Sequence, residues 1–258
     1  MNTLLNHSFK SIAFTAVVGL TILQGCQSSS SDSPTPAGPT ANIAVRQDAK
    51  FGQVLTDGSG NTLYLFAKDV EGKSACSGGC TDVWPVFYEK NRVFDSSLDS
   101  TQFGVITRAD GSKQNTFKGW PLYRFAQDTK AGEVNGEGKN SFYVAKPDYT
   151  VMVADKGAGK YLVSIGGRTL YTFTGDTDDI SNCKDGCLTV WPQFLAQPSA
   201  IAPSTLNGVF FGSISRADGT KQTTANKKPL YYFQNDVVRG DVKGTAANPK
   251  FVLVAPAQ

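Results

Sequence analysis

Four cysteines form two pairs with the same spacing, Cys76-x3-Cys80 and Cys183-x3-Cys187. A disulfide within either pair would close a loop of about five residues and stabilise the fold by about 2 kcal/mol in the chain-entropy model. Two thiolates at this spacing also suit Cu(I) or a redox centre. The spacing therefore predicts either two local disulfides or a copper or redox site.

Histidine is almost absent from the chain, and this excludes several kinds of catalytic and metal-binding site. The single histidine, His7, lies in an N-terminal segment with the features of an export signal, and the single methionine beyond that segment is Met152. Without histidine, a Ser-His-Asp triad, a histidine base and histidine metal ligands are excluded. Export leads to an oxidising compartment, so we predict disulfides rather than copper or redox sites.

A second pattern, Tyr-x-Phe-x-x-Asp, occurs four times. Its tyrosine and phenylalanine are two residues apart, so they share one face of a strand, and its aspartate falls where the strand ends and can accept backbone N–H bonds in a turn. A ligand-binding Tyr/Asp pair is the functional alternative, but a fourfold signature favours a shared packing role. The members are Tyr64, Phe66 and Asp69; Tyr123, Phe125 and Asp128; Tyr171, Phe173 and Asp176; Tyr231, Phe233 and Asp236.

Each cysteine pair is followed at a fixed step by Trp-Pro, at Trp84 and at Trp191. We expect each indole to be buried against its disulfide, because large aromatic side chains are usually buried. A solvent-facing pair of tryptophans would instead indicate a carbohydrate-binding platform.

A third pattern, Arg-Ala-Asp-Gly-x-Lys-Gln, occurs twice. We expect its Asp-Gly to form a hairpin turn, its arginine and aspartate to form an ion pair, and its Lys-Gln to form an exposed flank. A binding role is the alternative, since loops on a rigid sheet often carry function. The residues are Arg108, Asp110, Lys113 and Gln114 in the first copy and Arg216, Asp218, Lys221 and Gln222 in the second.

An acidic cluster, Asp176, Asp178 and Asp179, raises the question of calcium, which takes several oxygen ligands. The corresponding stretch Asp69-Val70-Glu71 has fewer carboxylates, so we expect solvated loops and predict no cofactor or metal site.

The N-terminus resembles the signal of a bacterial lipoprotein. Lys10 precedes an apolar run from Ile12 to Leu23, and Leu23-Gln24-Gly25-Cys26 resembles a lipobox. This resemblance implies cleavage after residue 25 and lipidation of Cys26. With Gln27 in place of aspartate, it also implies sorting to the outer membrane of a Gram-negative bacterium.

The remaining chain is an internal duplication behind a Ser/Pro-rich tether, residues 26–43, which we expect to be disordered. The patterns above recur at an offset of 107 residues as far as Trp-Pro, and of 108 residues from Arg108 onward. We predict two tandem homologous domains, 44–148 and 149–258.

Period-two alternation and turn residues predict an all-β fold, with each domain a small barrel or sandwich built from hairpins and meanders. The expected strands of the first domain are 53–56, 62–66, 103–107, 113–117, 122–125 and 142–145, with a helical turn within 81–88.

Taken together, these motifs resemble the predicted lipoprotein family with a Y-x-(F/W/Y)-x-x-D motif, also called the secreted repeat of unknown function. The resemblance covers residues 50–256 as two tandem copies. Many members carry Trp-His near the end of the unit, where this chain has Phe142-Tyr143 and Phe251-Val252.

The chain has 25 Lys and Arg residues and 22 Asp and Glu residues, and it contains no block of basic residues suited to binding nucleic acid. We therefore expect a lipid-anchored binding or structural module of the cell envelope, with a membrane contact through its lipid and an envelope protein or glycan as partner. The alternative is a redox or copper-handling protein. An enzyme using tyrosine, aspartate, arginine and lysine ranks last.

Overall fold

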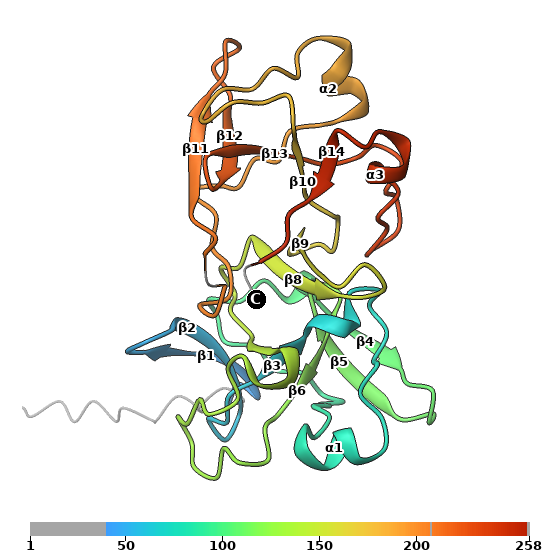
Figure 1. Cartoon of the computed structure of the whole chain (residues 1–258). Coiled ribbons are helices and arrows are strands. Elements are labelled where there is room, and N and C mark those ends of the chain that lie inside the picture. Colours follow the sequence, from blue (N-terminus) through green and yellow to red (C-terminus); the bar gives the residue numbers. More distant parts are fainter. Residues whose placement is uncertain (1–39, 207, 257–258) are drawn as a thin grey trace, which may run out of the picture. The chain divides into compact units, whose positions relative to one another are not determined.

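The computed structural model describes residues 40–206 and 208–256. The expected signal, Cys26 and most of the predicted tether lie outside the described residues. The described part is all-β, with short helices only, and consists of two halves with closely matching element orders (Figure 1). In this part of the chain, no helix is both long and apolar enough to cross a membrane.

Each half is built around short strands and one-turn helices. The first half contains β1 (Ile43–Asp48), β2 (Gly52–Asp57), β3 (Tyr64–Phe66), η1 (Ala67–Asp69), α1 (Gly79–Val83), η2 (Ser100–Gln102), β4 (Phe103–Thr107), β5 (Lys113–Phe117), β6 (Trp120–Tyr123), η3 (Lys139–Ser141) and β7 (Phe142–Val144). The second half contains β8 (Val151–Asp155), β9 (Lys160–Ser164), β10 (Tyr171–Phe173), α2 (Gly186–Val190), β11 (Phe211–Ser215), β12 (Lys221–Ala225), β13 (Lys228–Tyr231), α3 (Gly244–Ala247) and β14 (Phe251–Leu253).

The two halves have the same sheet topology. The five-stranded sheets are antiparallel, with strand orders β4-β5-β6-β3-β7 and β11-β12-β13-β10-β14. In both, the strand bearing the first Tyr-x-Phe signature lies between the strand of the second signature and the last strand. The predicted all-β duplication is confirmed, and β4 and β11 are edge strands.

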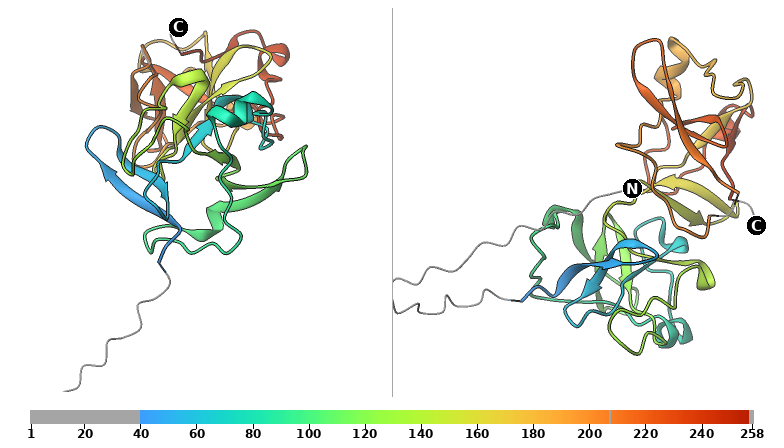
Figure 2. Two further views of the ribbon diagram at one scale, coloured as in Figure 1. Left: turned by 90° about the horizontal axis from the view of Figure 1, so that it is seen from below. Right: turned by 90° about the vertical axis from the view of Figure 1, so that its left-hand side faces the viewer.

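A separate two-stranded hairpin precedes each sheet, β1–β2 in the first half (blue in Figure 2) and β8–β9 in the second. Equivalent backbone bonds join each hairpin to its sheet: Leu55 N donates to Ala145 O at 2.8 Å, and Leu162 N donates to Val254 O at 2.8 Å. The sequence pattern located β2 but missed β1. Ile43, assigned to the tether, is instead fully buried at the start of β1.

Some boundaries differ from those expected. The helical turn predicted within 81–88 lies at Gly79–Val83, so it begins within the first disulfide loop, and Trp84 caps its C-terminal end. The strand expected at 122–125 begins earlier, at Trp120, because the tight turn at Lys118 and Gly119, with φ of 46° and 80°, leaves no room for a longer loop.

The buried apolar residues form one large cluster that includes side chains of both halves, such as Leu65 and Trp120 from the first and Val153 and Leu170 from the second. Two smaller aromatic clusters lie beside the disulfides, one in each half. The two halves share one compact unit, so they are packed against each other rather than joined only by a linker.

Arg239 of the second half makes the most extensive polar contact between the halves. Its guanidinium donates to two carbonyls of the first half, Val70 O at 2.9 Å and Lys118 O at 3.1 Å, and to Gly166 O of its own half at 2.7 Å. It also lies over the Trp120 ring, 5.1 Å from the ring centroid. Burial without a carboxylate partner among the described residues lowers the pKa of Arg239 to about 10.

Candidate functional site

The four signature tyrosines form two directly opposed cross-strand pairs, Tyr64 with Tyr123 and Tyr171 with Tyr231. Each hydroxyl donates to the aspartate of the other signature in the same half. The bonds run from Tyr64 to Asp128 at 2.6 Å, from Tyr123 to Asp69 at 2.6 Å, from Tyr171 to Asp236 at 2.6 Å and from Tyr231 to Asp176 at 2.8 Å. Each half therefore carries two copies of the signature, and the tyrosine of each copy is hydrogen-bonded to the aspartate of the other.

The same aspartates also accept a backbone N–H from the following turn, as expected from their position at the strand ends. Asp69 Oδ1, for example, accepts from Ala75 N at 2.7 Å. Burial raises the pKa of Asp69 to about 7, although the bonds from Tyr123 and Ala75 and the charge of Arg108 act to lower the pKa. Burial likewise raises the pKa of Tyr231 to about 12, so the hydroxyl stays a donor.

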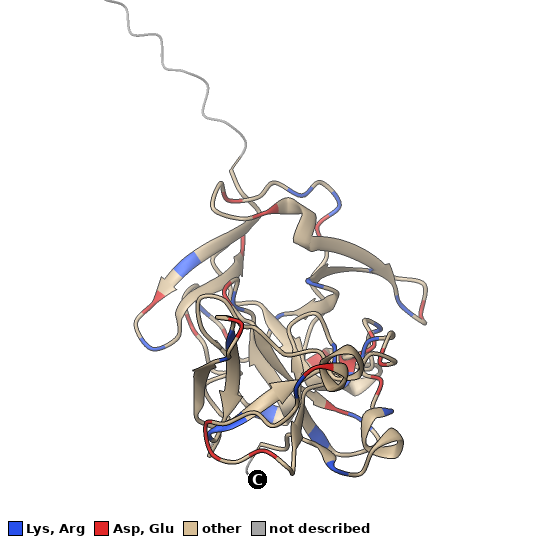
Figure 3. Ribbon diagram, turned by 90° about the horizontal axis from the view of Figure 1, so that it is seen from above, with Lys and Arg blue, Asp and Glu red and all other residues tan. Residues whose placement is uncertain are grey.

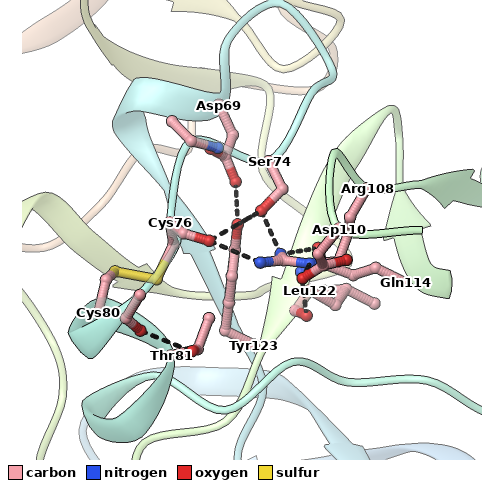
Figure 4. Close-up of a disulfide and its surroundings, with 12 residues drawn as sticks. Asp69, Ser74, Cys76, Cys80, Thr81, Arg108, Asp110, Gln114, Leu122 and Tyr123 are labelled. Carbon is pink, nitrogen blue, oxygen red and sulfur yellow. Dashed lines mark hydrogen bonds and ion pairs between the residues drawn. A yellow bond between two sulfur atoms is a disulfide. The ribbon is translucent and has the colours of Figure 1, made fainter. Parts of the chain in front are cut away.

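Arg108 links this pair to the disulfide loop (Figure 4). Its Nη2 donates to Cys76 O at 2.7 Å, and its Nη1 donates to Gln114 Oε1 at 2.8 Å and to the Ser74 hydroxyl. The predicted ion pair with Asp110 is present at 3.4 Å. The guanidinium is buried, so Arg108 is part of the core rather than of an exposed loop.

The prediction of an exposed Lys-Gln flank is wrong for the glutamine and right for the lysine. Gln114 and Gln222 are fully buried, whereas Lys113 and Lys221 are exposed. Alternation along the strand explains this, because adjacent residues point to opposite faces. The amide of Gln114 donates to Leu122 O at 2.8 Å, and that of Gln222 to Leu230 O at 2.8 Å, so both glutamines tie neighbouring strands together.

The second half repeats this network with one difference. Arg216 donates to Ser181 Oγ at 2.7 Å, Gln222 Oε1 at 2.5 Å and Cys183 O at 2.6 Å. Among the described residues, however, Arg216 has no carboxylate within 4.0 Å, and Asp218 remains exposed. The guanidinium of the second half is only half-buried, so this network is more open than that of the first.

Both cysteine pairs form the predicted local disulfides, Cys76–Cys80 and Cys183–Cys187, with Cα atoms 5.4 Å apart in each. In residues 40–206 and 208–256, no group of three or more histidine, cysteine, aspartate or glutamate side chains is arranged to hold a metal. In the acidic cluster considered for calcium, Asp176 is bonded to Tyr231, and Asp178 pairs with Lys228 at 3.2 Å.

Both tryptophans are buried against the disulfide clusters, as predicted, so they form no solvent-facing carbohydrate platform. Trp84 is 1% exposed and Trp191 is 4% exposed. Each indole stacks on a phenylalanine of the last strand, with 3.8 Å between the centroids of Trp84 and Phe142 and 3.6 Å between those of Trp191 and Phe251.

The residues that sequence reasoning singled out for chemistry are therefore mostly paired with one another inside the two cores. Tyrosine hydroxyls, carboxylates, guanidinium groups and glutamine amides are bonded in both halves, and the cysteines are oxidised. Charged residues of both signs are interspersed over the described loops (Figure 3). Differences between the halves are thus the better guide to a binding site.

One such difference is a surface of the second half that sequence reasoning missed. Two adjoining cavities, of about 570 Å³ and about 420 Å³, lie along the edge strand β11, and Asp179 lines both. We call this surface the β11 groove. Its apolar lining residues are Ile180, Leu188, Phe210, Phe211 and Ile214, and its polar ones include Asp179, Arg216, Thr224, Asn226 and Lys227.

Aligning the halves at the offsets of 107 and 108 residues shows which residues differ between the groove and the equivalent surface of the first half. Phe210, Ile180 and Leu188 replace Gln102, Lys73 and Thr81 of the first half. Phe210 is 77% exposed and Ile180 is 57% exposed. A sequence signal was thus present: polar residues of the first copy become apolar at matched positions of the second.

The first half keeps a counterpart of the groove, and a turn of the second half borders it. A cavity of about 470 Å³ is lined by Gly104, Thr116 and Lys118 of the first half and by Ile165 and Gly166 of the second half. Trp120 Nε1 donates to Ile165 O at 2.7 Å and secures that turn. In this fold, the surface therefore serves for packing against another protein element.

Comparison with known families agrees with this internal repetition. The family described as a secreted repeat of unknown function matches residues 45–88, 104–145, 152–194 and 212–250, and each matched segment contains one Tyr-x-Phe-x-x-Asp signature. The description as secreted agrees with the export expected from the N-terminal sequence. No curated protein and no solved structure matches the chain. Because the four segments together cover more than half of the chain, the protein belongs to this family of secreted repeats of unknown function.

Proposed function

We propose that the protein is a lipid-anchored module of the cell envelope that binds a partner protein through the β11 groove. The single observation that carries the proposal is the exchange of polar residues in the first half for exposed apolar ones in the second, above all half-buried Gln102 for Phe210, which is 77% exposed. Exposed apolar side chains beside a cavity are typical of a protein-binding surface.

The chemistry of the groove favours a protein over a glycan. Sugar-binding platforms present aromatic faces to solvent, yet both stacked tryptophans are buried. The exposed side chains of Phe210 and Ile180 stand beside the charged residues Asp179 and Lys227. An apolar centre with a charged rim is the usual anatomy of a protein interface.

A binding role also agrees with the state of the polar side chains. A catalytic residue needs a free, accessible polar atom near its substrate. Within each core, the hydroxyl of each signature tyrosine is hydrogen-bonded to a signature aspartate. We therefore assign these residues to stability, and we assign recognition to the groove.

The anchor is supported by the lipobox-like Leu23-Gln24-Gly25-Cys26. Replacement of Cys26 by serine should abolish lipid attachment and leave the protein uncleaved or soluble. Incorporation of labelled palmitate, followed by membrane fractionation, measures this directly. Normal labelling of the Cys26→Ser protein would refute the anchoring part of the proposal.

The binding part is tested by placing a photo-cross-linking amino acid in the anchored protein within living cells. Positions Phe210 and Ile180 should each yield a discrete protein adduct on illumination. The matched controls are Gln102 and Lys73, the equivalent positions of the first half, which should yield none. Absence of adducts at both groove positions, with normal protein levels, would overturn the binding role.

A further inference from the structure

We propose that the occupant of the β11 groove is a second copy of this chain, bound around a two-fold axis near Phe210. This inference rests on the proposed binding role and names the partner. It starts from the contact between the halves, where an equivalent surface already packs against a repeat unit of the same fold.

The existing contact cannot simply be repeated on the second half. Arg239 fits against Gly119, where an added Cβ would lie 2.8 Å from its Nη1 atom, and against Gly72. The equivalent residues of the second half are Lys227 and Asp179, which carry side chains although their φ angles are 66° and 57°. These side chains fill the place that an arginine would need. Head-to-tail packing therefore ends after two units, which prevents open-ended assembly.

A two-fold contact fits the groove, because the groove combines complementary features on one patch. The exposed Phe210 ring stands at the rim of the 570 Å³ cavity, so the ring of one copy can enter the cavity of the other. Asp179 and Lys227 are both exposed and line the same cavity, so each can face its opposite charge across the axis. Two-fold contacts require a patch of this self-complementary kind.

The aromatic residue is held in place for such a contact. Phe210 N donates to Asn226 Oδ1 at 2.8 Å, and Asn226 N donates to Phe210 O at 2.8 Å. The first half has the equivalent bond from Lys118 N to Gln102 O at 2.7 Å but places a polar side chain there. A preorganised backbone lowers the entropic cost of association.

The first test measures the oligomeric state of the exported chain 27–258, which lacks the lipid but keeps every described residue, by sedimentation velocity. We expect a concentration-dependent dimer. Phe210→Asp should weaken dimerisation by about tenfold or more, as for a central interface residue. Val237→Asp is the matched control, because Val237 is also 77% exposed but lies outside the groove, and its dimer should be unchanged.

The second test uses the full lipoprotein in its own envelope. Phe210→Cys should form a disulfide-linked dimer on non-reducing gels, whereas Val237→Cys should not. A monomer in sedimentation, or equal cross-linking of both variants, would overturn the second copy as occupant. Photo-adducts of Phe210 to a different protein would also overturn it and leave the binding role intact, whereas absence of all adducts would remove both.

Discussion

The two halves share a fold, a disulfide and a Tyr–Asp network, yet they differ in what surrounds them. In the first half, Ile165 and Gly166 of the second half border the surface beside β4, and the arginine of the network is buried. In the second half, the equivalent surface beside β11 carries more apolar residues, with Phe210 77% exposed, and its arginine is half-buried. The interiors of the two halves therefore match, whereas this exterior face differs.

The aromatic cluster beside the disulfide is also larger in the first half than in the second. The first cluster includes Phe51 and Val54 of the β1–β2 hairpin together with Trp84. The second cluster includes no residue of the β8–β9 hairpin, and Phe173 is only half-buried. The position equivalent to Phe51 is Ala158, so the second stack lacks that covering ring. We infer that the first half is the more tightly packed of the two.

The largest expected effect comes from removing the stacked indoles. Trp84→Ala and Trp191→Ala should each lower the free energy of unfolding by about 3–5 kcal/mol, because each leaves a large cavity. Trp84→Ala should cost more, since its cluster is larger. Urea denaturation followed by circular dichroism measures both. Equal losses would contradict the inferred difference in packing, and an unchanged midpoint would contradict burial of the stack.

The next effect concerns the contact that joins the halves. Arg239→Ala removes two hydrogen bonds to the first half, one within its own half, and a cation–π contact with Trp120. We expect a loss of about 2–4 kcal/mol, because two part-buried carbonyl groups of the first half lose their charged donor. The calorimetric transition should also broaden or split as the halves uncouple.

The glycines beside Arg239 provide a matched pair for the same comparison. Gly119→Ala should have an effect in the same direction, because the added Cβ would lie 2.8 Å from Arg239 Nη1. Lys227→Ala, at the equivalent position of the second half, should leave the transition unchanged. An unchanged transition for Gly119→Ala would contradict the close fit of Arg239 against this glycine.

A smaller effect, equal in the two halves, is expected for the disulfides. Replacing Cys76 and Cys80 with serine should lower the free energy of unfolding by about 2 kcal/mol, and replacing Cys183 and Cys187 should do the same, because both loops have the same length. Thermal melts with and without reductant check this. A larger loss in the first half would mean that its tighter cluster also depends on the bridge.

The most specific effect is on pH dependence. Burial raises the pKa of Asp69 from 3.8 to about 7, so the folded protein holds a proton that the unfolded chain releases. The free energy of unfolding should therefore fall as the pH rises from about 4 to about 7, and then level off. Burial acts to raise the pKa of Asp57, but its hydrogen bonds and the charge of Arg124 lower this pKa below 3.8. Asp57 therefore ionises below the pH range in which Asp69 affects stability.

The variant Asp69→Asn isolates this contribution. Because it cannot ionise, the fall in stability between pH 4 and 7 should become shallower in urea titrations. The remaining slope is expected from groups such as Glu137, Asp176 and Asp236, whose pKa values burial also raises. An identical pH profile for the variant and the original protein would contradict the raised pKa of Asp69.

Local pattern determined much of this molecule. Period-two alternation and turn residues placed β4 and β5 at their observed bounds, and repeated spacings identified the duplication and both disulfides. These features depend on residues close in sequence, whose geometry is set by strand pleat, turn type and loop length. The pattern favoured a packing role for the Tyr-x-Phe-x-x-Asp signature, and its four tyrosines are buried.

Only the tertiary structure decided how distant residues meet. The exchange of hydrogen bonds between Tyr64 and Asp128, and between Tyr123 and Asp69, joins residues more than fifty positions apart. Burial of Gln114, coverage of the first half by Arg239 and exposure of Phe210 likewise depend on which surfaces the fold brings together. Residues at matched positions of the two halves can be buried by a neighbouring segment or exposed to water. Contacts with segments that are distant in sequence decide which of the two occurs.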